Sequence, residues 1–334
     1  MRPLTRACVI ESGRNRFTVS ITEDLNPELE RELAAPFGST PGASVPEGGD
    51  VTGSGSAWRL IVRSFFDNKL GILGVSLLVL LLLFSFVGPI FYHSDTTIAT
   101  YNINLPPGPG HPLGTDPSGR DVLGRLMTGG QDSLIIGIVS ALVSTIIGTL
   151  WGAISGFFGG AVDTVMMRIV DVLLAIPTIF ILLYLETIYH PTVLLLIITI
   201  SVVSWLTAAR LVRGETLSLR TREYVRAVRI MGGGRFRTIV RHIIPNTIGV
   251  VVVQATFSVA NAILILATLG FLGFGLAPPA ADWGSMLSGG VNYIYDGYWW
   301  LIYPAGILIV LTVLAFNFIG DAMRDALEVR LQRR

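Results

Sequence analysis

The chain has 334 residues, of which 51% are hydrophobic and only 14% are charged. Soluble domains average about 25% charged residues, so this composition excludes an ordinary soluble enzyme, a disordered chain and a nucleic-acid-binding protein. The formal net charge of +1 implies no global electrostatic steering, and the single cysteine excludes a disulfide framework or a cysteine metal cluster.

The first 57 residues differ from the rest. Residues 36–57 are rich in proline, glycine and serine and cannot bury a core. Residues 1–35 are polar, with a stretch at 27–34 that could form a short helix, and they lack the apolar region of a signal peptide. We expect a flexible, dispensable N-terminal tail over 1–57, with a regulatory tail as the alternative.

Long uncharged runs dominate the remainder. A helix needs roughly 20 apolar residues to cross about 30 Å of hydrocarbon. Five runs without Asp, Glu, Lys or Arg reach that length: 70–94, 133–162, 187–209, 243–281 and 297–320. A sixth span is predicted over 166–185, with Arg168 and Asp171 one helical turn apart near one membrane face, where they could pair. The sequence therefore predicts an all-α polytopic membrane protein with six transmembrane helices.

Arginines set the orientation of these spans. They are concentrated before the first span, between spans four and five, and after the last span, whereas the opposite loops hold only Arg120 and Arg125. Because cytoplasmic loops carry the excess of basic residues, both termini are predicted to be cytoplasmic. The predicted order is a cytoplasmic tail 1–57, an amphipathic start and first helix 58–92, an extracytoplasmic loop 93–130, a core 131–321 with a cytoplasmic loop 213–245, and a cytoplasmic tail 322–334.

No catalytic arrangement is found. A phosphate-binding P-loop needs G-x-x-x-x-G-K-[ST], but the only lysine, Lys69, lies outside such a context. The four histidines are scattered, so we expect no metal site, no cofactor and no enzymatic activity in this chain. Spans one, two, four, five and six lack ionisable residues, which disfavours an ion-coupled carrier. An ATP-independent channel or secondary carrier remains the alternative from another class.

The cytoplasmic loop between spans four and five carries the sharpest pattern. Residues 223–231 can form a helix, three glycines at 232–234 break it, and 236–244 can form a second helix with apolar residues at i, i+3, i+4 and i+7. A helix–turn–helix on this face could fill a groove on a partner protein. The alternative is an amphipathic helix lying on anionic lipid, for which the many arginines are suited.

This loop resembles the E-A-A-x-x-x-G-x9-I-x-L-P signature of type I ABC importer permeases. Arg226, Ala227 and Val228 stand at E-A-A, and Gly232 stands at the glycine. The string E-Y-V-x-A is similar to the dipeptide/oligopeptide/nickel branch. The departures are arginine for the acid, valine for the second alanine, histidine for isoleucine and isoleucine for leucine. The resemblance implies an ATPase-coupling loop made of Glu223, Tyr224, Arg226, Ala227, Val228, Gly232, Gly233, His242, Ile244 and Pro245.

Residues 58–92, 111–126 and 271–325 look like the same branch, so the resemblance covers 58–334. It implies the second permease subunit of a binding-protein-dependent importer in a prokaryotic cell membrane. The implied partners are a homologous permease, two cytoplasmic ATPases that hold ATP and Mg, an extracytoplasmic binding protein and the lipid bilayer. The implied mechanism is alternating access driven by ATP hydrolysis on those partners, with peptides as cargo and nickel as the alternative.

Other candidates each have a structural alternative. Asp116, Arg120, Asp121 and Trp283 are candidate binding-protein contacts, but the charged three could instead brace their loop, and Trp283 could belong to an aromatic belt. Candidate residues of the translocation path are Pro177, which could kink span three, and Asn261 and Asn317, which could instead form interhelical hydrogen bonds. The Gly148-x-x-x-Gly152-x-x-x-Gly156 ridge predicts close helix packing or a moving pore interface.

Overall fold

The computed structural model describes residues 10–12, 15–17, 62–92, 101–232 and 234–332. It divides into a unit of residues 1–52 and a unit of residues 53–334. In the first unit, strands β1 (Ile10–Ser12) and β2 (Asn15–Phe17) pair antiparallel, with Ile10 opposite Phe17. This pair was not predicted. The expected helix at 27–34 and the flexibility of the tail fall outside the described residues.

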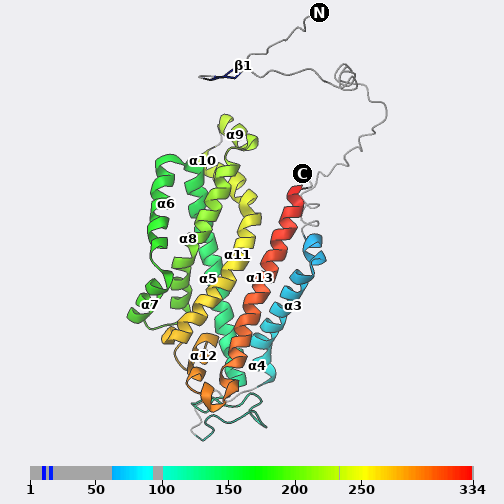
Figure 1. Ribbon diagram of the computed structural model, residues 1–334, viewed down its shortest axis with the longest axis vertical. Helices are drawn as coiled ribbons and strands as arrows, with labels where there is room; N and C mark the ends of the chain where they lie inside the picture. Colours follow the sequence, from blue (N-terminus) through cyan, green and yellow to red (C-terminus); the bar gives the residue numbers. More distant parts are fainter. Residues whose placement is uncertain (1–9, 13–14, 18–61, 93–100, 233, 333–334) are drawn as a thin grey trace, which may run out of the picture. The chain divides into compact units, whose positions relative to one another are not determined.

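The second unit is mainly helical over its described residues, with an irregular segment at 101–121 (Figure 1). Its α-helices are α3 (Lys69–Leu82), α4 (Gly88–Phe91), α5 (Val122–Phe158), α6 (Gly160–Ala175), α7 (Thr178–Ile188), α8 (Val193–Leu219), α9 (Glu223–Ile230), α10 (Arg235–Thr238), α11 (Ile244–Leu269), α12 (Trp283–Val291) and α13 (Tyr303–Gln332). Short π-helical turns join α3 to α4, α10 to α11, and α11 to the segment that precedes α12. The predicted all-α membrane fold is confirmed for this unit.

Five helices among the described residues are long and apolar enough to cross a membrane, and α6 with α7 makes a sixth span if the bent pair is counted as one. The pair is bent by 79°. The bend lies at Ile176 and Pro177, where Ile176 is extended at φ −89° and ψ 126°. Proline disfavours the helical conformation of the residue before it, so the predicted kink at Pro177 is a full break of the helix.

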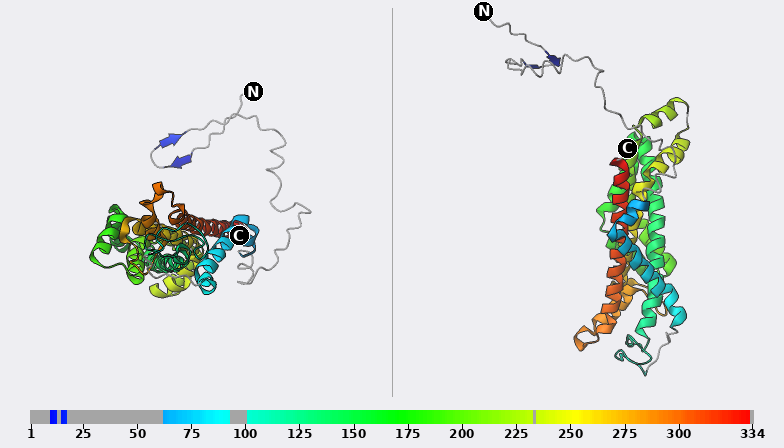
Figure 2. Two further views of the ribbon diagram at one scale, coloured as in Figure 1. Left: turned by 90° about the horizontal axis from the view of Figure 1, so that it is seen from below. Right: turned by 90° about the vertical axis from the view of Figure 1, so that its right-hand side faces the viewer.

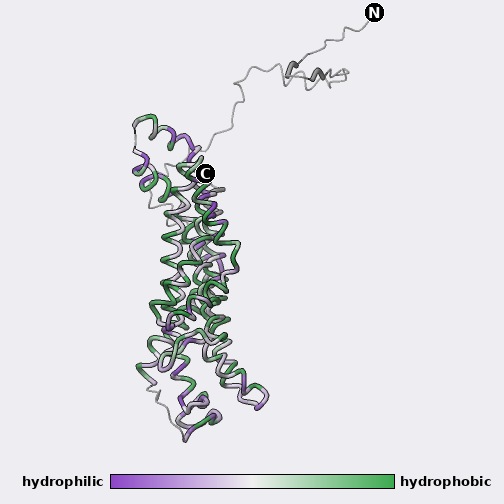
Figure 3. The backbone as a smooth tube through the Cα atoms, turned by 90° about the vertical axis from the view of Figure 1, so that its left-hand side faces the viewer, coloured by the Kyte–Doolittle hydropathy of each residue, from purple (hydrophilic) through white to green (hydrophobic). Residues whose placement is uncertain are grey.

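The two ends of the bundle carry different features. The start of α3, the α9–α10 turn and the end of α13 lie at one end, while α12 and residues 101–121 lie at the other (Figure 1). Hydrophobic residues follow the middle of the bundle, and hydrophilic residues gather at its ends (Figure 3). This is the arrangement that six crossings of a membrane require.

Helix α5 packs along α8 through the predicted glycine ridge. A β-carbon built on Gly152 would lie 2.4 Å from the backbone oxygen of Ala209, and one on Gly148 would lie 2.6 Å from the Ala208 methyl group. One on Gly156 would lie 2.8 Å from the β-carbon of Thr216. The two backbones therefore touch, and close helix packing is the role that the structure gives this ridge.

Ion pairs tie α6 to α8. Asp163 accepts two hydrogen bonds from the Arg213 guanidinium, at 2.5 and 2.6 Å, and Asp171 pairs with Arg210 at 2.6 Å. The expected pairing of Arg168 with Asp171 is therefore wrong. Asp171 points to the arginine on the neighbouring helix, while Arg168 on its own helix is exposed.

Three predicted boundaries shift. Helix α5 begins at Val122 rather than near 131, because Asp121 caps it by accepting a 2.8 Å hydrogen bond from the Gly124 amide. Helix α8 continues to Leu219, so the connection between α8 and α11 is shorter than the predicted 213–245. Helix α13 continues to Gln332, so most of the predicted tail 322–334 is the end of a helix.

Candidate functional site

The α9–α10 turn projects beyond the long helices (Figures 1 and 2). Helix α9 ends at Ile230, and Gly232 adopts φ +81°. This left-handed conformation is the one that glycine tolerates at a helix end, so the predicted break is confirmed at Gly232. Gly233 lies outside the described residues, and α10 begins at Arg235.

Three buried side chains anchor this turn to the bundle. Val225, Ile239 and Ile243 have exposures of 0%, 5% and 0% and pack in one cluster with Phe157 and Val212. The predicted apolar stripe of the second helix therefore divides in two. Ile239 and Ile243 are buried, whereas Phe236 and Val240 are exposed. The turn is therefore packed against α5 and α8.

The outer surface of the turn is apolar at its tip. Ile230, Met231 and Phe236 are 86%, 77% and 78% exposed, and Tyr224 is 41% exposed. Ala227 is exposed on α9 between them along the chain. Large exposed apolar groups at the end of a monomer mark an interaction surface. The sequence pattern missed Ile230 and Met231, although their position beside the glycines could have indicated them.

The remaining predicted loop residues differ in their exposure. Arg226 and Glu223 are exposed, Val228, His242 and Ile244 are half-buried, and Pro245 stands in the first turn of α11. Because Pro245 lacks an amide hydrogen, the chain forms a π-helical turn over residues 239–243 immediately before it. The second helix therefore continues into span five without a stop.

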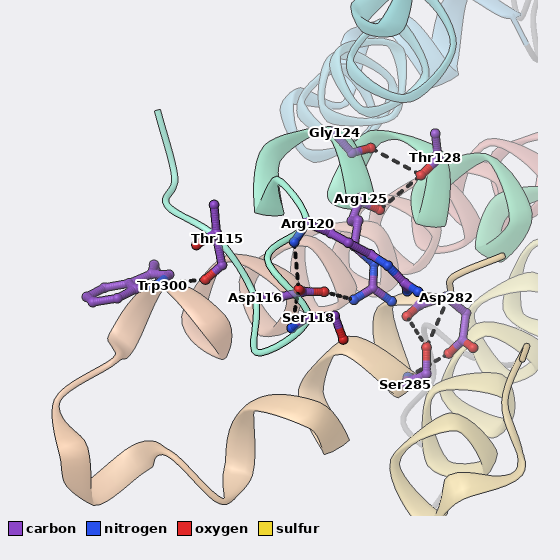
Figure 4. Close-up of polar contacts among 10 residues, drawn as sticks. All are labelled: Thr115, Asp116, Ser118, Arg120, Gly124, Arg125, Thr128, Asp282, Ser285 and Trp300. Atoms are coloured by element: carbon purple, nitrogen blue, oxygen red, sulfur yellow. Dashed lines mark hydrogen bonds and ion pairs between the residues drawn. The ribbon is translucent and has the colours of Figure 1, made fainter. Parts of the chain in front are cut away.

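At the other end of the bundle, a buried polar network holds residues 101–121 (Figure 4). Asp116 accepts hydrogen bonds from the amides of Ser118 and Arg120, at 2.8 and 2.9 Å, and pairs with Arg125. Asp116 is 6% exposed and Arg120 is 8% exposed. These groups brace the loop from inside the subunit.

Asp121 and Trp283 are buried as well, each with 1% exposure. Asp121 caps α5 and lies 3.3 Å from Nδ1 of His111, and the Trp283 indole donates a 2.9 Å hydrogen bond to the Leu126 carbonyl. The expectation that Asp116, Arg120, Asp121 and Trp283 form the outer contact surface is therefore corrected, because their side chains are enclosed within the subunit.

Several of the exposed side chains at this end are aromatic. Tyr101 is 95% exposed, Tyr295 is 99% exposed and Trp299 is 49% exposed. Solvent-exposed tyrosine and tryptophan at the tip of a loop are suited to protein contacts, since such residues dominate binding energy at interfaces.

Comparison with known families favours an importer permease over an ATP-independent channel or secondary carrier. The family model described as "Binding-protein-dependent transport system inner membrane component" matches residues 148–333, more than half of the chain. The chain belongs to this family of permeases. The model "N-terminal TM domain of oligopeptide transport permease C" also matches, over residues 56–107.

Relatives of this permease share most of its length. The oligopeptide transport system permease protein OppC of Escherichia coli (strain K12) is 44% identical over 276 residues, covering 82% of this chain and 91% of that protein. The dipeptide transport system permease protein DppC of Bacillus subtilis (strain 168) is 37% identical, covering 83% and 86%. A chain of the inward-facing MetNI methionine ABC transporter aligns with a TM-score of 0.49 and 21% identity over 59% of this chain and 93% of that chain.

The three candidate residues of the translocation path, Pro177, Asn261 and Asn317, do not lie at one place. Asn261 on α11 lines a cavity of about 730 Å³ bounded by α6, α7, α8 and α11. Pro177 precedes Thr178, which lines the same cavity. Asn317 on α13 is half-buried and is not among the lining residues. The structure thus places Asn261 on the wall of this cavity and Pro177 next to a residue of the wall, and leaves Asn317 elsewhere.

Asp282 is a site residue that the sequence did not single out. It has 0% exposure, accepts hydrogen bonds from the Leu276 amide at 2.9 Å and the Ser285 amide at 2.8 Å, and caps α12. Burial raises the pKa of Asp282, although its hydrogen bonds from backbone amides act in the opposite direction. This carboxyl group therefore links the segment after span five to α12. One oxygen accepts from the Leu276 amide, and the other accepts from the Ser285 amide in the first turn of α12.

Replacing Asp282 with alanine should destabilise the end of the permease that carries α12. The change leaves two buried amides without an acceptor, at a cost of about 1–3 kcal/mol each. We expect a lower unfolding temperature of the purified transporter in detergent. Asp296→Ala removes an exposed carboxylate at the same end and serves as the control. Equal melting temperatures for the two variants would contradict the capping role.

Proposed function

We propose that this permease subunit forms half of the translocation path of a peptide importer. The observation that carries the proposal is the 44% identity, over 91% of its length, to a permease named for oligopeptide transport. The 37% identity to a dipeptide permease supports the same cargo class. In this proposal the subunit pairs with a homologous permease and receives peptides from an extracytoplasmic binding protein.

ATP hydrolysis, in our proposal, takes place on two cytoplasmic partner subunits that hold ATP and Mg. The apolar tip formed by Ile230, Met231 and Phe236 supplies an anchor for an ATPase groove, and Ala227 allows close approach. Movement of the ATPases would pass through Val225 and Ile239 to α5 and α8. The spans would then alternate between outward-facing and inward-facing states, as in alternating access.

The lipid-binding alternative for this turn fits less well. An interfacial helix buries its apolar face at the headgroup boundary and lies in the membrane plane. Here the exposed apolar tip stands at the far end of the turn, beyond the long helices, while the apolar groups nearest the bundle are already buried within it (Figure 2). A protein groove is the occupant that this arrangement favours.

The proposed orientation places the turn and both termini in the cytoplasm. The test is cysteine labelling in a Cys8→Ser background, with Ser218→Cys in the last turn of α8 and Tyr295→Cys at the opposite end, both exposed positions. In intact cells, an impermeant thiol reagent should label residue 295 and leave residue 218 unmodified. Permeabilised cells, in which both react, provide the control. Labelling of residue 218 in intact cells would reverse the orientation.

The function itself is tested by deletion and complementation. A strain without the gene should lose uptake of a radiolabelled tripeptide and regain it when the gene is returned on a plasmid. Unchanged peptide uptake combined with lost nickel uptake would favour the nickel alternative. Uptake that continues after the ATPase genes are deleted would favour an ATP-independent channel or carrier.

A further inference from the structure

The cavity of about 730 Å³ is within the size range of ligand-binding pockets, roughly 300–1,000 Å³. Its walls come from four helices that belong to three predicted spans. All of its lining residues are uncharged, and half of them are polar. The polar residues used below are Ser204 and Thr207 on α8, and Gln254, Ser258 and Asn261 on α11.

The polar residues of α11 form a stripe on one face. Gln254, Ser258 and Asn261 follow at i, i+4 and i+7, the spacing that places residues on one side of a helix. The Gln254 amide donates a 3.3 Å hydrogen bond to the Ser258 hydroxyl. The side chain of Asn261 is exposed and lines the cavity. A polar stripe of this kind in an otherwise apolar span faces the cavity rather than a neighbouring helix.

The wall formed by α8 carries hydroxyl groups that the subunit does not fully use in hydrogen bonds. The Ser204 hydroxyl oxygen is buried and has no hydrogen-bond partner among the described residues. Buried polar groups are normally satisfied, so an orphan of this kind calls for an explanation. Hydroxyl and carboxamide groups both donate and accept hydrogen bonds. The exposed Thr207 side chain on α8 and the stripe on α11 therefore offer neutral donors and acceptors to a ligand that carries both.

We propose that this cavity is a transient binding subsite for the backbone amides of a peptide in passage. Backbone N–H and C=O groups recur along every peptide, and neutral partners bind them whatever the charge of the side chains. The neutrality of the lining therefore lets acidic and basic peptides pass with similar ease. This inference rests on the proposed function as a peptide importer and assigns the site within it.

The test introduces charge at Asn261 and reads the charge preference of transport. The complete transporter with its binding protein is reconstituted in proteoliposomes, and uptake of an acidic and a basic tripeptide is measured for Asn261→Asp and Asn261→Lys. Each rate is divided by the wild-type rate for the same peptide, which cancels the preference of the binding protein. We expect the aspartate variant to favour the basic peptide by about five-fold, and the lysine variant to favour the acidic peptide by a similar factor.

Two controls keep the result interpretable. Asn317→Asp makes the same exchange on α13, away from the cavity, and should produce no charge preference. Asn261→Cys in the Cys8→Ser background is modified after assembly with cationic or anionic thiol reagents, so a variant that fails to fold does not decide the outcome. Failure of the Asn261→Cys variant to react with these reagents, or variants that transport without preference, would overturn the subsite while leaving the proposed function intact. No peptide uptake by the wild type would overturn the proposed function instead.

Discussion

Replacing Gly232 with valine should leave the subunit in the membrane while ATP hydrolysis no longer drives import. Gly232 has φ +81°, and nothing lies within 4 Å of a β-carbon built there. The cost therefore comes from the backbone, where a β-branched residue is strained by about 1 kcal/mol or more. That strain falls on the turn that presents Ile230 and Met231. If the docking free energy falls by about 1.4 kcal/mol, the affinity for the ATPases falls about ten-fold.

Ala227→Asp should have the same effect by another route. Ala227 is exposed in the subunit, so the carboxylate costs little until an ATPase covers it. Burying an unpaired charge in the contact then costs several kcal/mol. The measurements are co-purification of the ATPases, ATPase activity stimulated by the binding protein, and peptide uptake in vesicles.

Matched changes at the same positions serve as controls. Gly232→Asn keeps a residue that tolerates positive φ, and Ala227→Ser keeps a small neutral side chain. Both should retain most coupling. Normal assembly and transport by Gly232→Val and Ala227→Asp would show that the turn is not the coupling element and would favour the lipid-bound interpretation.

The second large effect is expected where α5 meets α8. A methyl group at Gly152 would stand 2.4 Å from the Ala209 backbone oxygen and 2.8 Å from the Arg213 amide nitrogen. Neither is the end of a flexible side chain, so the helices must separate. Overpacking of this kind costs roughly 1–3 kcal/mol, and we expect Gly152→Ala to lower both the membrane level and the unfolding temperature of the subunit.

Gly214 on α8 offers a matched comparison. A β-carbon there has nothing within 4 Å. The same exchange, Gly214→Ala, should be neutral or slightly stabilising, because alanine is favoured over glycine inside a helix by up to about 1 kcal/mol. Fluorescence-detected size-exclusion chromatography after heating measures both variants. Equal stability of the two would contradict the close packing of α5 on α8.

The spans and the glycine turn could be predicted from sequence because each depends on local chemistry. Uncharged runs of membrane length can fold only as helices in lipid, and the glycine triplet ends α9 whatever surrounds it. The break at Pro177 follows from the same kind of rule, although its 79° size does not.

The burial of the external network could not be predicted in this way. Asp116, Arg120 and Asp121 look like surface charges in the sequence, and only the packing of residues 101–121 against α5 and Trp300 encloses them. The pairing of Asp171 with Arg210 likewise depends on how α6 meets α8. The exposed groups that replace these candidates, such as Tyr101 and Tyr295, share their residue types with buried aromatics, so composition alone does not separate them.

Uptake by the reconstituted transporter tests the central claim most directly. Proteoliposomes containing both permeases and both ATPases are supplied with binding protein outside and ATP inside, and accumulation of a labelled tripeptide is followed alongside accumulation of nickel. The account predicts peptide accumulation that requires ATP and the binding protein and disappears when this subunit is left out, with no accumulation of nickel. Peptide entry without ATP, or accumulation of nickel in place of peptide, would contradict it.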